Sequence, residues 1–118
     1  MDWKDAFEKG QELILATCSS KAEPNANIVI SLGFVDDKLL IADSQMDTTL
    51  KNLQSTKQIC VISKKGYYRM KGTIEIFNSG KYFDLCNEAD KQYPAKNAVL
   101  ISVNEVFDLD NVKAIPLN

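Results

Sequence analysis

The chain has no histidine among its 118 residues. This absence excludes histidine-based catalytic triads, histidine general bases and most catalytic metal sites. The three cysteines, Cys18, Cys60 and Cys86, are widely spaced and form no Cys-x-x-Cys pair. An odd number of isolated cysteines argues against a disulfide framework and against a structural zinc site. We therefore expect reduced thiols and no bound metal.

The sequence also lacks an excess of positive charge. Fourteen lysine and arginine residues are outnumbered by sixteen aspartate and glutamate residues, which gives a formal net charge of −2. Affinity for nucleic acid comes mostly from neutralised phosphates, and no basic run forms a stripe here, so a nucleic-acid partner is disfavoured. A small ligand with a single phosphate remains compatible with this charge.

Long apolar runs are missing as well. None approaches the length of a membrane span, and the segment Met1 to Asp5 is too charged for the start of a secretory signal. We therefore expect a cytoplasmic protein with no membrane partner. The length fits a single domain over residues 1–118 that needs no metal or disulfide to fold.

Apolar runs separated by polar turns predict six β-strands and three short helices. The helices are expected at residues 3–10, 47–55 and 81–92, the last of them stopped by Pro94. Gly72 lies inside the long fifth strand and indicates a bulge. The strands are expected at residues 13–18, 25–34, 39–43, 58–63, 67–78 and 98–107.

The order of these elements indicates the fold class. Most strands follow one another through short turns, and helices interrupt them only after the third and fifth strands. A doubly wound parallel sheet would need strands and helices to alternate, so the pattern favours a mainly antiparallel barrel.

The segment with the clearest chemical character is residues 40–53, which runs from an apolar strand through a polar loop into a helix. A helix start presents unpaired backbone N–H groups and the positive end of the helix dipole. Thr48, Thr49 and Lys51 add two hydroxyls and an ammonium group at this helix start. Such a combination suits a phosphate group.

This helix start follows a strand that reads Asn25-Ala26-Asn27-Ile28-Val29-Ile30-Ser31. Together the two segments resemble the FMN-binding split-barrel family related to pyridoxamine 5'-phosphate oxidases, and the order of elements matches that family from about Glu12 to Phe107. The resemblance implies a mainly β fold, a six-stranded antiparallel split β-barrel with two or three short helices.

The resemblance also implies a cofactor and an assembly. It suggests an FMN-binding oxidoreductase or a small flavin electron carrier that acts as a homodimer, with the flavin at the subunit interface and its substrate or electron donor unspecified. The flavin then carries the redox chemistry while the protein positions it, and no side chain is assigned as a catalytic acid or base. The residues matched to the cofactor site are Asn27, Ile28, Val29, Ala42, Asp43, Ser44, Thr48, Thr49 and Lys51.

The phosphate segment departs from the family pattern, which commonly has a lysine or arginine where this chain has Thr48 and Thr49 beside Asp47. Two hydroxyls hold a phosphate more weakly than a cation does. An alternative therefore stays open, in which the chain is a non-redox split-barrel module that binds another phosphorylated small ligand or a protein partner. In that case Asp47 is an ordinary helix cap and Lys51 a solvated helix residue.

Aromatic residues leave a similar choice. Trp3 and Phe7 fit either the core or a dimer contact, because large aromatic side chains usually serve burial. Tyr67 and Tyr68 could line a ligand cleft, but adjacent strand residues point to opposite faces, so at most one of the two would do so.

Overall fold

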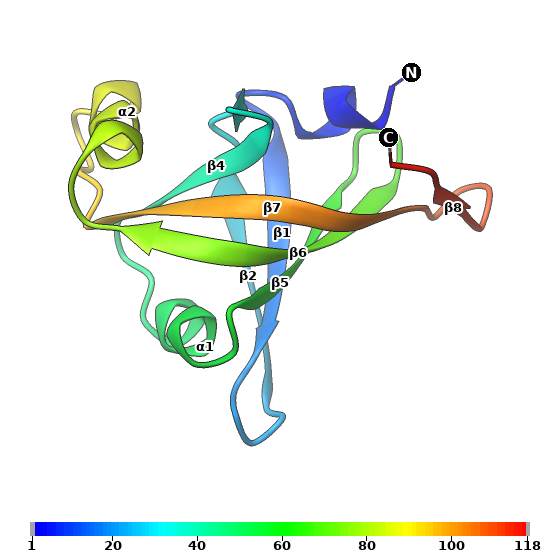
Figure 1. The fold of residues 1–118 in the computed structure, drawn as a ribbon, viewed down its shortest axis with the longest axis horizontal. Coiled ribbons are helices and arrows are strands. Elements are labelled where there is room, and N and C mark those ends of the chain that lie inside the picture. Colours follow the sequence, from blue (N-terminus) through cyan, green and yellow to red (C-terminus); the bar gives the residue numbers. More distant parts are fainter. Residues whose placement is uncertain (1, 118) are drawn as a thin grey trace.

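A computed structural model describes residues 2–117 of the chain, and Figure 1 shows its fold. The six expected strands and the two later helices are present, and two further short strands occur. The helix expected at residues 3–10 is instead a 3-10 helix that ends at Phe7. In chain order the elements are η1 (Trp3–Phe7, a 3-10 helix), β1 (Glu12–Cys18), β2 (Pro24–Ile30), β3 (Phe34–Val35), β4 (Lys38–Asp43), α1 (Thr48–Thr56), β5 (Gln58–Ser63), β6 (Tyr68–Phe77), α2 (Lys81–Ala89), β7 (Asn97–Asp108) and β8 (Lys113–Ile115).

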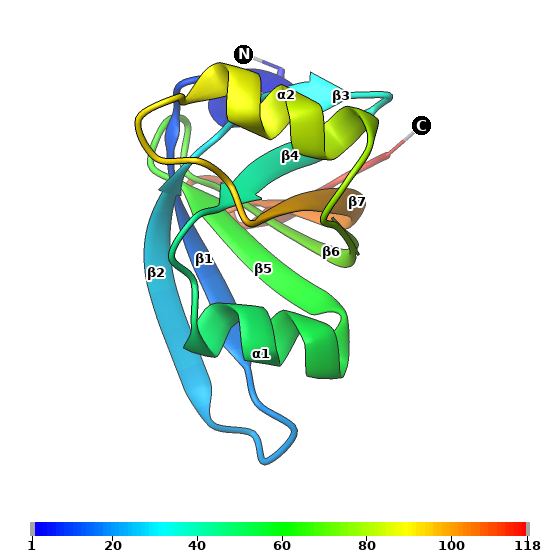
Figure 2. The same cartoon turned by 90° about the vertical axis from the view of Figure 1, so that its left-hand side faces the viewer.

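All strands belong to one antiparallel sheet in the order β2-β1-β5-β6-β7-β4-β3, with β8 paired to the end of β7. The sheet curls, and Figure 2 shows α2 above and α1 below, with β2 along the left edge. The end strands β2 and β3 form no ladder with each other within residues 2–117. The predicted class, mainly β and antiparallel, is therefore confirmed, but the count of six strands is wrong, since eight form an open sheet.

Local backbone geometry explains the differences in strand number. Asp36 and Asp37 both adopt positive φ angles, 51° and 65°, and this tight turn creates the two-residue strand β3 opposite β4. Strand β8 follows Val112, another residue with positive φ, in a tail that shows no apolar alternation. Strand β2 ends at Ile30, four residues before the predicted end at Phe34.

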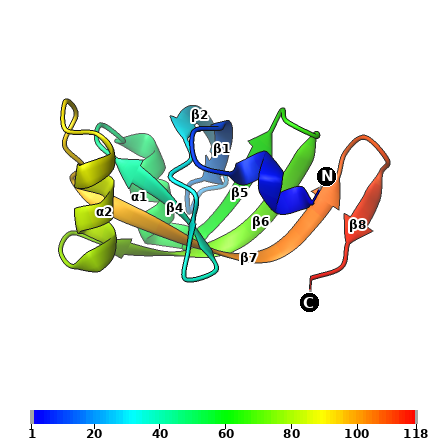
Figure 3. The same ribbon diagram turned by 90° about the horizontal axis from the view of Figure 1, so that it is seen from above.

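The core lies between the concave face of the sheet and the N-terminal 3-10 helix. Phe7 is completely buried, and the Trp3 ring contacts Phe7 and Phe34 edge-on, with ring centroids 6.2 and 5.9 Å apart. The hydroxyls of Ser31 and Ser63 donate to the carbonyls of Phe7 and Ala6 at 2.7 and 2.6 Å. In Figure 3 η1 lies over this end of the sheet. Phe7 therefore belongs to the core.

The bulge predicted at Gly72 is present as a register shift between Lys71 and Gly72 in the pairing of β6 with β7. A Cβ atom at Gly72 would lie 2.3 Å from the Ser102 carbonyl oxygen, so only glycine allows this close approach of the two backbones. The bulge bends β6 and β7, the two longest strands of the sheet.

The helix after β6 is shorter than predicted, because α2 ends at Ala89 and not near Gln92. Its end is set by Asp90, whose carboxylate accepts hydrogen bonds from the backbone N–H groups of Gln92 and Tyr93 at 2.9 and 3.2 Å. This local turn replaces helical hydrogen bonding before Pro94 is reached. Neither of the α-helices is long and apolar enough to cross a membrane within the described residues.

Candidate functional site

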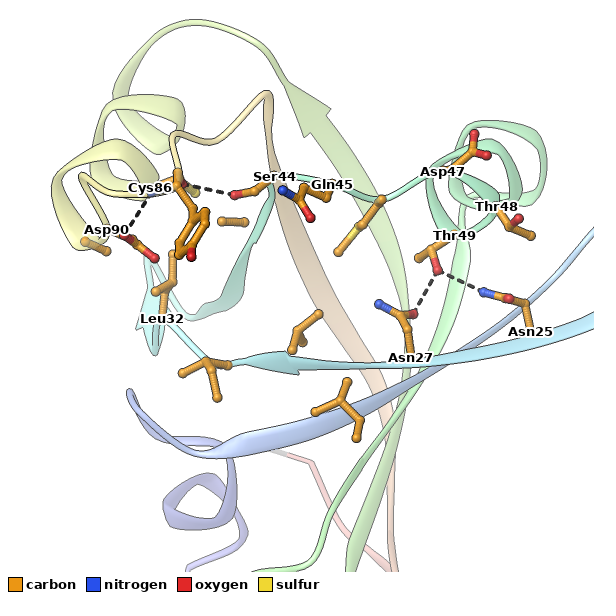
Figure 4. A pocket seen from close by; sticks show the side chains of 17 residues that line it. Asn25, Asn27, Leu32, Ser44, Gln45, Asp47, Thr48, Thr49, Cys86 and Asp90 are labelled. Atoms are coloured by element: carbon orange, nitrogen blue, oxygen red, sulfur yellow. Dashed lines mark hydrogen bonds between the residues drawn. The ribbon is translucent and has the colours of Figure 1, made fainter.

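A cavity of about 470 Å³ lies between the outer edge of β2, the end of β4, the start of α1 and the end of α2. Figure 4 shows its polar side chains gathered at two ends, one beside α1 and one beside α2, with apolar side chains between them. Its size falls in the range of small-molecule sites. It is lined by Asn25, Asn27, Ile28, Val29, Ile30, Leu32, Ala42, Ser44, Gln45, Met46, Asp47, Thr48, Thr49, Cys86, Ala89, Asp90 and Tyr93.

The start of α1 opens onto this cavity without a side-chain cap. Asp47 stands at the N-cap position, but its carboxylate makes no capping hydrogen bond. It is exposed and pairs instead with the Lys51 ammonium at 3.4 Å. The first N–H groups of a helix have no intrahelical partner, so the amides of this turn remain available to a ligand.

Thr49 and Thr48 have different roles in this turn. Thr49 is only 4% exposed, and its hydroxyl donates to the Asn27 side-chain oxygen at 2.8 Å and accepts from the Asn25 amide at 2.9 Å. Figure 4 shows this relay of three side chains along β2 and α1. The Thr49 proton is used inside the relay, whereas Thr48 is exposed at the cavity and its hydroxyl has no partner within residues 2–117.

The relay also fixes the carboxamide of Asn27. Its oxygen is occupied by Thr49, so its NH2 group is left to face the cavity as a hydrogen-bond donor. The donors at this end are therefore the Asn27 amide, the Thr48 hydroxyl and the first amides of α1. All of them are electrically neutral.

The end of β4 has a structural role in addition to lining the cavity. Asp43 is fully buried, and its carboxylate accepts from the backbone N–H of Met46 at 2.9 Å and from the Asn97 amide at 2.7 Å. Its carbonyl accepts from the N–H of Lys96 at 2.7 Å. The neighbouring Ser44 hydroxyl donates to the Tyr93 carbonyl at 3.2 Å. These bonds hold the α2–β7 loop against β4.

Helix α2 forms the opposite end of the cavity. Cys86 is buried there, and desolvation raises the pKa of its thiol to about 11, so it is an inert lining group. Asp90 and the half-exposed ring of Tyr93 complete this end. Asp47 and Asp90 are the only ionisable carboxylates of the lining, and it contains no lysine or arginine.

Seven of the nine residues matched to the cofactor site line this one cavity: Asn27, Ile28, Val29, Ala42, Ser44, Thr48 and Thr49. The other two do not. Asp43 turns inward to bind Met46 and Asn97, and Lys51 lies one turn along α1, where it pairs with Asp47. Tyr67 and Tyr68 are also absent from the lining, since Tyr67 is exposed and Tyr68 packs against the core.

Sequence reasoning missed Asn25 and the α2 side of the cavity. Asn25 carried a usable signal, because residues 25, 27 and 29 share one face of β2. Nothing local marks Cys86, Asp90 or Tyr93, which reach the cavity only through the packing of α2 on β4 and β7.

Comparisons with known proteins agree with this architecture. A family model described as pyridoxamine 5'-phosphate oxidase matches residues 2–112. HupZ of Group A Streptococcus has a similar structure, with 21% sequence identity, a TM-score of 0.83 and coverage of 96% of this chain and 95% of that one.

Two further solved structures show the range of this fold. An FMN-binding protein of Syntrophomonas wolfei is 19% identical, with a TM-score of 0.67 over 98% of this chain and 82% of that one. HutZ, a heme storage protein of Vibrio cholerae, is 13% identical, with a TM-score of 0.66 over 93% and 91%. No curated protein matches the sequence. At these identities the structures are alike in fold, and the family model extends over nearly the whole sequence: the chain belongs to the pyridoxamine 5'-phosphate oxidase family.

Proposed function

We propose that this chain binds FMN in the cavity beside β2 and acts as a flavin oxidoreductase or electron carrier. The observation that carries the proposal is the uncapped start of α1, which opens onto a cavity of about 470 Å³ next to the fixed donor of Asn27. Helix amides and neutral donors are suited to a phosphate, and the apolar middle of the cavity is suited to an aromatic ring.

The residues present fit the cofactor in outline. Thr48, Asn27 and the first amides of α1 would hold the phosphate, while Val29 and Ala42 would contact the flavin. Bound FMN would supply the hydride or electron transfer, which no side chain of this chain can perform. The protein would orient the ring and limit access of water. No side chain of the lining is assigned as a general acid or base, and the Cys86 thiol stays protonated near neutral pH.

A homodimer is part of the proposal because the cavity is bordered by exposed apolar residues. Ile28 and Ile30 at the edge of the cavity are 62% and 51% exposed. A second copy that covered them would both bury apolar surface and enclose the ligand. Sedimentation at micromolar concentration should therefore give a dimer, and a monomer that binds FMN tightly would contradict this part.

A second candidate is favoured by the charges of the site. The lining contains Asp47 and Asp90 but no cation, so a non-redox module for another phosphorylated ligand or for a protein partner is the alternative. Haem has less support, although HutZ is a haem storage protein, because this chain has no histidine to serve as an axial ligand.

A titration with FMN separates these candidates. Binding should shift the visible flavin spectrum and change flavin fluorescence. Thr48→Glu, which adds a negative charge at the exposed start of α1, should abolish both changes. Lys113→Gln, a charge change on β8, is the matched control and should bind as the native protein does. FMN that stays spectrally unchanged at high protein concentration would reject the flavin function. Reduction of bound FMN by NADH or NADPH would then favour a reductase over a carrier.

A further inference from the structure

The cavity lacks the positive charge that a phosphate needs for tight binding. Its only charged side chains are Asp47 and Asp90, and the ammonium group of Lys51, one turn along α1, is engaged by Asp47. Hydrogen bonds from charged donors are roughly twice as strong as those from neutral ones. A cation from outside the cavity would therefore change its preference for anionic ligands more than any neutral group could.

Arg69 is the only arginine of the chain. Its guanidinium stacks over the Phe107 ring, with 5.0 Å between the guanidinium carbon and the ring centroid. It forms no ion pair within residues 2–117, and its Nε is buried without a hydrogen-bond partner there. This arginine keeps a hydrogen-bond donor that no group of the described residues accepts. It is therefore suited to bind an acceptor from outside a single copy of the chain.

The sheet register places Arg69 and the cavity at two ends of one row. Ile28 pairs with Ile14, Ile14 with Ile62, and Ile62 with Arg69, so four neighbouring strands contribute one residue each. The residues flanking this row in β1, β5 and β6, such as Leu13, Val61 and Met70, are fully buried. Alternation along each strand therefore turns the row to the outside of the sheet. We call these four residues the outer row.

The outer row ends at the cavity, because Ile28 belongs both to the row and to the cavity lining. Arg69 lies three strand spacings away, about 14 Å at roughly 4.8 Å per spacing, so its side chain cannot reach the cavity of its own copy. The three isoleucines give the row an apolar surface, which a second copy of this chain would cover.

Symmetry then determines what faces Ile28. If two outer rows pack face to face about a two-fold axis that runs along the strands between β1 and β5, Arg69 of one copy faces Ile28 of the other. A two-fold axis across the strands would instead place Arg69 opposite its own symmetry mate, and the two like charges would repel each other. Charge therefore favours the arrangement that brings Arg69 to the cavity mouth.

We propose that Arg69 of the partner subunit supplies the cation missing from the cavity and binds the anionic group of the ligand across the dimer interface. This inference rests on the proposed FMN function, and it adds a residue that determines specificity for a phosphorylated over an unphosphorylated ligand. It also explains how a neutral donor set beside two carboxylates can serve a phosphate.

The first test compares FMN with riboflavin, which lacks the phosphate. Arg69→Met keeps a linear apolar stem on Phe107 but removes the charge, and it should weaken FMN binding about ten- to a hundredfold while riboflavin binding stays unchanged. Arg69→Lys should retain much of the preference for FMN, and Lys113→Gln, which removes a charge elsewhere, should retain all of it. An unaltered ratio of FMN to riboflavin affinity in Arg69→Met would overturn the inference.

The second test asks whether Arg69 acts across the interface. Subunits with Arg69→Met and subunits with Thr48→Glu are given different tags, and the mixed dimer is purified, so the result does not depend on self-assembly of either variant. One of its two cavities then has an intact helix start and receives a native Arg69 from the other subunit. We expect one tight FMN site per mixed dimer and none in either parent.

Each result has one meaning. A mixed dimer with no tight site would show that Arg69 acts within its own subunit or not at all, and would refute the proposal even if native protein binds FMN. Native protein that binds neither FMN nor riboflavin would refute the proposed function itself. Tight FMN binding by a native monomer would refute the cross-subunit contact and leave FMN binding in place.

Discussion

Replacing Thr49 by valine tests the relay that shapes the cavity beside the start of α1. Valine has nearly the shape of threonine but no hydroxyl, so the change leaves the Asn27 oxygen and the Asn25 amide without their partner at 2.8 and 2.9 Å. A typical intramolecular hydrogen bond contributes about 0.5 to 1.5 kcal/mol to stability. Two lost bonds therefore set an upper range of about 1 to 3 kcal/mol.

The expected loss lies in the lower part of this range. Thr49 itself is buried, but Asn25 and Asn27 are only half-buried, so water can replace part of what their amides lose. We expect the free energy of unfolding to fall by about 1 to 2 kcal/mol. With a slope near 2 kcal/mol per molar urea, the unfolding midpoint should move down by about 0.5 to 1 M.

Thr48→Val is the matched control on the same helical turn. Thr48 is exposed and its hydroxyl has no partner within the described residues, so this variant should stay within about 0.5 kcal/mol of the native protein in urea. Its FMN affinity, in contrast, should fall. Equal stability of Thr49→Val and Thr48→Val, at an unchanged urea slope, would refute the relay as a stabilising element.

Three further predictions concern other parts of the fold. Gly72→Ala should destabilise the protein by about 1 to 3 kcal/mol in urea, because its Cβ would meet the facing backbone carbonyl at 2.3 Å; native stability would contradict the close approach. The hydrogen bond from Lys81 lowers the pKa of Asp36, so its contribution to stability is present above about pH 4 and is lost as the pH falls through the lowered value. Lys81→Gln should raise that pKa in a carboxyl NMR titration. Iodoacetamide at pH 8 should modify exposed Cys18 well before Cys86, whose thiol pKa is raised to about 11 by burial, and equal labelling in the folded protein would refute that burial.

The strands and the helix start could be predicted because their signals are local. Apolar alternation in β1 and β5, and a polar loop followed by Leu50 and Leu53, depend only on neighbouring residues. The same holds for the bulge at Gly72. The order of these elements and the family resemblance also brought together seven of the nine predicted site residues, which line one cavity.

Orientation of individual polar side chains could not be predicted in the same way. Asp43 turns inward because Asn97, 54 residues later, is paired opposite it on β7. The Thr49 hydroxyl is taken by Asn25 and Asn27 from another strand. Such contacts depend on which strands become neighbours, and one-dimensional periodicity carries no information about that.

The open edge of the sheet could not be predicted for the same reason, because it also depends on which strands become neighbours. Six predicted strands can close a barrel or leave a gap, and the choice depends on curvature and on short elements such as the Phe34–Val35 strand. Alternation in β2 marks its two faces but does not tell whether a further strand lies along its edge. The sheet order, in which the end strands β2 and β3 do not pair within the described part of the chain, leaves a gap between them. The proposed ligand and dimer both depend on this gap.

The sheet order also has a consequence for biosynthesis. Strand β7 (Asn97–Asp108) follows β1, β2, β4, β5 and β6 along the chain, yet it lies in the interior of the sheet between β6 and β4. A nascent chain can pair β1 with β2 and β5 with β6 while it is still on the ribosome, but β4 has no long partner until β7 emerges. The apolar side chains of β4 therefore stay without their main strand partner until residues 97–108 have been translated, and chaperones can bind them during that interval.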